Sequence, residues 1–132
     1  MPRPSGRADV ELRLPADSAY VSVLRTTSAG LAARLDFTLD DLEDLRMAVG
    51  EASAMVLGAS HDGVDLTAEF WLDRRAITVR VSAPGETPEL GAEDDFAWQV
   101  LATLASEASV ECVDGRYAIT LLVGAAPLET GA

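Results

Sequence analysis

The stretch that decides the fold runs from Thr38 to Ala59 and reads TLDDLEDLRMAVGEASAMVLGA. Thr38 and Asp41 have the spacing of a capping box, in which two side chains satisfy free N–H groups at the start of a helix. Apolar residues follow at intervals of three and four, so they share one face of the helix. The sequence therefore predicts a long amphipathic helix that begins after Thr38 and ends near Gly58. Its apolar stripe consists of Leu42, Leu45, Val49, Ala52 and Val56.

The segment before this helix contains a strand and a first helix. Residues 10–14 alternate between apolar and polar side chains, the period of a half-buried strand, and Pro15 ends the alternation. Asp17 or Ser18 can cap a helix that runs to about Leu35. Its expected inner side consists of Val21, Leu24, Leu31 and Leu35.

The segment after the long helix contains two hairpins separated by a loop and a shorter helix. Residues 64–72 and 77–81 alternate on either side of a turn at 73–75, and Asp114-Gly115 is a strong signal for the turn of the last hairpin. Residues 83–95 are rich in Pro, Gly and acids, which predicts an acidic loop. The third helix is expected to place Phe96, Val100, Leu101 and Leu104 on its apolar side.

This order of elements predicts the fold class. Helices clustered between antiparallel strands indicate an α+β, two-layer sandwich, with a mostly antiparallel sheet and helices on one face. The chain has 132 residues, which suits one domain. We expect that domain to span residues 9–124, between a flexible N-terminal tail (1–8) and a C-terminal tail (125–132).

Composition and charge exclude several classes of function. The formal net charge is -12, with 22 acids against 10 basic residues, so we expect no direct binding to nucleic acid and no binding to anionic membranes. A basic protein surface is the favoured partner. No apolar run approaches the roughly 20 residues of a membrane span, and we expect a cytoplasmic protein.

Four residue types are scarce or absent. The sequence contains no Lys and no Asn, which excludes a Walker-type phosphate loop and Schiff-base chemistry. Cys112 and His61 are the single members of their types, too few for a hydrolase triad or a transition-metal cluster, and we expect no metal site. The alternation around Cys112 predicts a place in the core, whereas His61 is expected in an exposed loop.

Few side chains remain as candidates for chemistry. Glu51 is the one acid well inside the small, apolar segment 48–56, so it is either a carboxylate tuned by burial or an ordinary surface glutamate. Asp40 and Asp44 are one turn apart, but a solvated helix face explains them better than a cation site. Arg25 lies outside the apolar stripe of the first helix and is either solvated or a contact for a partner.

The string Asp44 to Ala52, DLRMAVGEA, together with the order of elements over residues 9–124, resembles the RsbW/SpoIIAB family of anti-sigma factors. These are small serine kinases with the Bergerat fold of histidine-kinase-like (GHKL) ATPases. The segment Phe96 to Leu101, FAWQVL, is similar to a divergent branch of the family typified by UsfX. The resemblance implies a homodimer that binds a sigma factor and an anti-anti-sigma factor.

The resemblance also assigns roles to particular positions. Glu51 matches the glutamate that polarises the attacking hydroxyl or water, and Met55 matches the asparagine that holds magnesium. Val81 occupies the position of the aspartate whose carboxylate binds the adenine amino group. That aspartate begins a box with two glycines, of which this sequence keeps only Gly85. A thioether does not replace a hard oxygen ligand for magnesium. The last phosphate-binding box is matched by Asp94-Asp95-Phe96-Ala97, which has no glycine and brings two negative charges.

Two hypotheses follow. In the first, the chain sequesters a sigma factor, or the antagonist of one, with Arg25 on the binding face and with degenerate ATP-binding boxes. No resident cofactor is then expected, and Mg-ATP binds weakly or not at all. In the second, the chain is an active serine kinase that uses Glu51 and Mg-ATP to phosphorylate an anti-anti-sigma factor.

Overall fold

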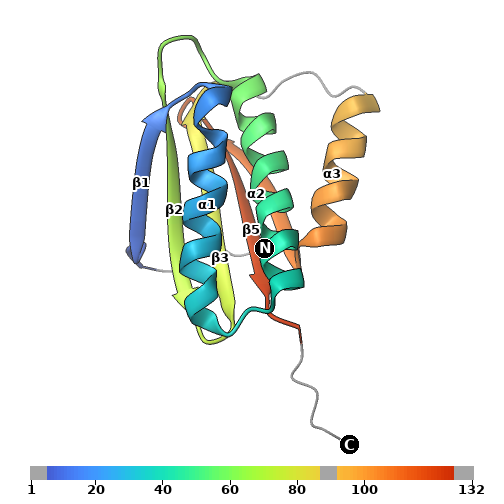
Figure 1. Ribbon diagram of the computed structural model, residues 1–132. Coiled ribbons are helices and arrows are strands. Elements are labelled where there is room, and N and C mark those ends of the chain that lie inside the picture. The colour runs from blue at the N-terminus through green and yellow to red at the C-terminus, as the bar shows by residue number, and fades with distance from the viewer. Residues whose placement is uncertain (1–5, 87–91, 127–132) are drawn as a thin grey trace, which may run out of the picture.

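The computed structural model describes residues 6–86 and 92–126, with side chains from Phe96 onward in the second range. Five strands and three α-helices follow one another in the order expected from the sequence (Figure 1). Short 3-10 turns flank the first α-helix. The elements are β1 (Val10–Pro15), α1 (Val21–Ala32), α2 (Leu39–Ala59), β2 (Asp65–Asp73), β3 (Ala76–Pro84), α3 (Ala92–Leu104), β4 (Glu107–Val113) and β5 (Arg116–Gly124).

The strands form one antiparallel sheet in the order β1-β2-β3-β5-β4. The three helices lie on the same face of this sheet (Figure 1). The predicted α+β two-layer fold is therefore confirmed. The buried layer between helices and sheet is centred on β3, where Val79 lies opposite Phe70 of β2 and Leu121 of β5 and all three are fully buried.

Helix α2 begins with the capping box that its sequence predicts. The Thr38 backbone N–H donates to the Asp41 carboxylate at 2.9 Å, and the Asp41 N–H donates to the Thr38 hydroxyl at 3.1 Å. The Asp41 carboxylate also accepts from the backbone N–H of Ala126. Because it accepts these hydrogen bonds, first of all that from Thr38, the pKa of Asp41 lies below its ordinary value of 3.8.

The apolar stripe of α2 packs as expected. Its residues from Leu45 to Val56 are fully buried, Leu42 is half-buried, and the helix ends at Ala59, one residue past the predicted end. Helix α1 differs more, because 3-10 turns at Ser18–Tyr20 and Ala33–Leu35 replace the ends of the single predicted helix. Asp17 caps the first of these turns.

The last hairpin has the predicted turn. Asp114 and Gly115 have φ values of 55° and 72°, and positive φ at both central residues is what a tight turn of this kind requires. The chain beyond β5 is held by a backbone hydrogen bond, in which the Ala125 N–H donates to the Arg75 carbonyl. No helix in the described parts of the chain is both long and apolar enough to cross a membrane.

Three expectations about the last third of the chain are wrong. Helix α3 begins at Ala92, four residues before the predicted start at Phe96. Phe96 is 69% exposed, because α3 packs beside α2 at the margin of the helical layer. Cys112 is exposed although it lies opposite buried Tyr117, because β4 is the edge strand of the sheet. Residues 87–91 of the predicted acidic loop, and the Asp94 and Asp95 side chains, lie outside the described residues.

Candidate functional site

Residues of the three helices line an open cavity of about 540 Å³. Arg25 of α1 and Glu51 of α2 both contribute to its wall. The sequence suggested these two residues for separate roles, one in partner binding and one in catalysis, and the structure brings them to the same cavity. The other lining residues are Met47, Gly50, Phe96, Gln99, Val100, Thr103 and Leu104.

Arg25 packs over Gly50 of the neighbouring helix, which has no side chain to displace it. A Cβ atom at Gly50 would lie 3.2 Å from Cδ of Arg25 and 3.4 Å from Nη1, so the arginine lies directly over this glycine. Glycine inside a helix costs about 0.5–1 kcal/mol relative to alanine. A side chain at residue 50 would press on Arg25 and shift it.

Glu51 is the next residue of the same helix and is half-buried. Its carboxylate and the Arg25 guanidinium supply opposite charges to one cavity whose other walls are mostly apolar or neutral. Such a surface can hold a polar group of a partner between the two charges and bury apolar side chains around it. Among the described residues, no group of three or more His, Cys, Asp or Glu side chains could hold a metal ion.

The remaining predicted site residues lie elsewhere. Met55, one turn after Glu51, is half-buried and packs against the hydrophobic core. Val81 is fully buried in the middle of the sheet, between Ala68 of β2 and Ile119 of β5. Neither residue is among those that line the cavity.

Gly85 has a structural role that its backbone explains. A Cβ at this position would lie 2.2 Å from the carbonyl oxygen of Ala59, so only glycine permits the contact between the end of β3 and the end of α2. Gly85 forms a β-bridge with Ser60, and the Glu86 N–H donates to the Ala59 carbonyl at 3.1 Å. This junction joins the end of β3 to the end of α2.

The contribution of α3 to the cavity was not predicted from the sequence. The lining residues Phe96, Gln99, Val100 and Thr103 recur at the three- and four-residue spacing of one helix face. That spacing was visible in the sequence, but a helix period alone does not say which neighbour the face meets. Met47 was missed for the same reason, since it is half-exposed on the flank of α2.

Comparison with known proteins gives related sequences and a related structure. The chain is 34% identical over 84 residues to the serine-protein kinase RsbW of Halalkalibacterium halodurans, which is 63% of this chain and 52% of that protein. It is 32% identical over 78 residues to RsbW of Bacillus mycoides, which is 58% of this chain and 49% of that protein. No family model matches the chain.

A solved structure has the same fold. The crystal structure of the RsbU and RsbW domains of Rv1364c from Mycobacterium tuberculosis matches 87% of this chain and 32% of that chain, with a TM-score of 0.64 and 16% identity. The matched segments span about half the length of the curated relatives. The chain is a relative of the RsbW-type serine-protein kinases, and the family expected from its sequence is confirmed. The likeness to the UsfX branch stays a prediction.

Proposed function

We propose that this chain is an anti-sigma-type regulator that binds a sigma factor, or the antagonist of one, and that its nucleotide site no longer functions. One observation carries the loss of the nucleotide site. The positions that match the family's magnesium ligand and adenine carboxylate are Met55 and Val81. Val81 lies in the hydrophobic core, and Met55 packs against it.

Catalysis by phosphoryl transfer needs charge neutralisation at the phosphates. Metal ions and backbone donors supply it in kinases, and magnesium takes oxygen ligands. Met55 offers a thioether in place of such an oxygen. The Val81 side chain offers no polar atom to an adenine base, and because it is fully buried there is no room for adenine beside it. The loss of both groups removes the contacts on which nucleotide affinity and catalysis depend.

The cavity between the helices suits a protein partner. Arg25 is exposed but held over Gly50, and Phe96 and Met47 are 69% and 52% exposed at the same cavity. Arginine and aromatic side chains dominate the energetics of protein interfaces. The net charge of -12 favours a partner with a basic surface and speeds its association. We place the binding face for the sigma factor here and propose a cytoplasmic homodimer.

Calorimetric titration with Mg-ATP tests the loss of the nucleotide site. We expect no measurable heat at micromolar protein, and the same result with a non-hydrolysable analogue. Micromolar affinity that depends on magnesium would contradict the proposal. It would instead favour the second candidate, an active kinase that phosphorylates an anti-anti-sigma factor, for which the observation is that Glu51 lines an open cavity. Loss of phosphorylation in Glu51→Gln would then identify the base.

Affinity capture tests the partner. The wild-type chain is expected to recover a sigma factor or its antagonist from lysate of the source cells. Arg25→Ala should recover about tenfold less, the loss typical of an interface arginine. Arg34→Ala is the matched control, since Arg34 is also exposed but does not line the cavity. If wild-type protein recovers neither partner, the proposal fails.

Light scattering tests the homodimer, which has twice the monomer mass of 13.9 kDa.

A further inference from the structure

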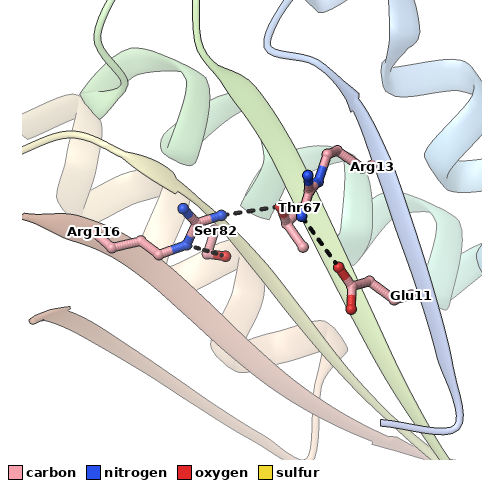
Figure 2. A network of polar contacts seen from close by, with 5 residues as sticks. All are labelled: Glu11, Arg13, Thr67, Ser82 and Arg116. Atoms are coloured by element: carbon pink, nitrogen blue, oxygen red, sulfur yellow. Dashed lines mark hydrogen bonds and ion pairs between the residues drawn. The ribbon is translucent and has the colours of Figure 1, made fainter.

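The face of the sheet opposite the helices carries a second cavity, of about 390 Å³. Its lining includes two arginines from strands that are not neighbours, Arg13 of β1 and Arg116 of β5. Thr67 of β2 lies between them, and Figure 2 shows both guanidinium groups directed toward it. Asp65 and Pro84 complete the wall together with the turn at Gly63.

Arg116 is held in one orientation by two hydroxyl groups. Its Nε donates to the Ser82 hydroxyl at 3.1 Å, and its Nη2 donates to the Thr67 hydroxyl at 3.0 Å (Figure 2). Ser82 and Thr67 are 2% and 9% exposed, so these anchors are fixed by the sheet. Both partners are neutral, and the positive charge of Arg116 is not compensated by them.

The same two bonds leave a defined set of donors. A guanidinium has five N–H donors in a rigid fork, and two of them are used here. The edge formed by Nη1 and Nη2 keeps one N–H on each nitrogen, the spacing that binds both oxygens of a planar oxyanion. Because the Thr67 and Ser82 oxygens accept from Arg116, their own O–H groups are left to donate.

Arg80 gives a contrast on the same face of the sheet. Its guanidinium pairs with the Glu111 carboxylate at 3.0 Å, and these side chains are only 20% and 29% exposed. Arg13, in comparison, approaches Glu11 at 3.7 Å, with side chains that are 66% and 53% exposed. An ion pair of this length between solvated groups is weak. The charge at Arg80 is therefore satisfied within the sheet, whereas Arg13 is available to a ligand.

From these contacts we propose that Arg13, Thr67 and Arg116 form a binding site for a carboxylate group. A carboxylate is planar and matches the free edge of Arg116. Its single charge also suits the site, because Asp65 already contributes one negative charge to the cavity and repels a dianion more strongly. The carboxylate can belong to a small organic acid or to an acidic side chain of a peptide. This site is separate from the helix-side cavity and does not depend on the proposed function.

The test is a nuclear magnetic resonance titration of ¹⁵N-labelled full-length chain with sodium acetate, against sodium chloride at equal ionic strength. A second arm uses the end-blocked tripeptide Gly-Asp-Gly and its Gly-Asn-Gly counterpart. We expect saturable shifts at the backbone amides of Asp65, Thr67 and Arg116 with acetate, and none with chloride or the Asn peptide. Tighter binding of the Asp peptide than of acetate would assign the carboxylate to a peptide partner, and equal or weaker binding to a small acid.

Three variants complete the test. Arg116→Lys keeps the positive charge but loses the two parallel N–H donors of the guanidinium, and should weaken acetate binding by about tenfold. Arg13→Gln changes an exposed side chain, so it should remain folded and weaken binding several-fold. Arg74→Gln is the control, since Arg74 is exposed in the turn between β2 and β3 and should leave binding unchanged. The proposal is overturned if acetate shifts match those of chloride, or if Arg13→Gln binds acetate as the wild type does.

Discussion

Helix α2 contributes to two regions that differ sharply, the cavity between the helices and the junction with β3. At the cavity, Glu51 and the Gly50 that accommodates Arg25 face an open space. One turn later Met55 faces the core, and beyond it Gly85 of the β3 end meets Ala59 with no space between the backbones. The region with the charged side chains of Arg25 and Glu51 is open, whereas the region around Met55 and Gly85 is packed. One helix can therefore contribute to an open, charged surface on one side and to a tightly packed junction on the other.

The largest expected effect comes from returning a carboxylate to the packed region. Val81→Asp should reduce the free energy of unfolding by at least about 3 kcal/mol, because the new carboxylate would be buried without a partner. Urea denaturation measures the change. Val113→Asp is the control, since Val113 is 43% exposed on the edge strand and should lose less than about 1 kcal/mol. A stable Val81→Asp variant that binds ATP would show that this region is an open pocket.

The second largest effect on stability is expected from substituting Gly85, the glycine at the junction of β3 and α2. Gly85→Ala places a Cβ 2.2 Å from the Ala59 carbonyl oxygen. The carbonyl belongs to the backbone, and the backbone of residue 85 fixes the position of the Cβ, so the structure has to shift. We expect a loss of about 2 kcal/mol in the free energy of unfolding. Gly58→Ala is the matched control on α2. It meets nothing within 4 Å and should gain up to about 1 kcal/mol. Equal stability of the two variants would be inconsistent with a tight junction.

A smaller effect is expected at the start of α2, which positions both regions. The Asp41 pKa is lowered in the folded state, so its carboxylate stabilises the fold above the ordinary pKa of 3.8 and loses this effect as the pH falls through the lowered value. Asp41→Asn should cost about 0.5 kcal/mol at neutral pH. Denaturation between pH 7 and pH 3 should show the difference from wild type shrinking below pH 4. A difference that stays constant with pH would contradict this assignment.

The smallest effect on stability is expected inside the cavity. In Gly50→Ala the gain in helix propensity, about 0.5–1 kcal/mol, is offset by the 3.2 Å approach to the flexible Arg25 side chain. Thermal denaturation should therefore change little. Partner capture should nevertheless fall, because Arg25 is displaced from its position over α2. Unchanged capture by Gly50→Ala, alongside reduced capture by Arg25→Ala, would show that the orientation of Arg25 does not matter.

Local signals in the sequence predicted most of the fold. The capping box of Thr38 and Asp41 and the turn at Asp114-Gly115 depend on residues close in the chain, so their outcome did not depend on the rest of the molecule. Helix α3 was predicted four residues too short, because its first turn consists of Ala92 to Asp95, where acids conceal the period. The exposure of Phe96 and Cys112 depends on position at the margin of a layer, which periodicity does not encode.

The candidate site could be predicted only in part. Met55, Val81 and Gly85 came from the resemblance, and Glu51 came also from its place in a small, apolar helical segment, but the sequence could not say which of them share a cavity. Arg116 and Thr67 were not singled out, since an arginine that begins a strand gives no signal of the hydroxyls it will meet. The contact between Arg116 and Thr67 joins residues 49 positions apart.

By itself, the sequence determined the order of helices and strands, the two-layer class and the absence of any asparagine, because these follow from residue identity and spacing along the chain. The tertiary structure alone decided that Arg25 and Glu51 face one cavity, that Gly85 closes on Ala59, and that Arg13 and Arg116 converge on Thr67. Each of these depends on strand register and helix packing between segments distant in the sequence, and such distances are set only when the core is formed.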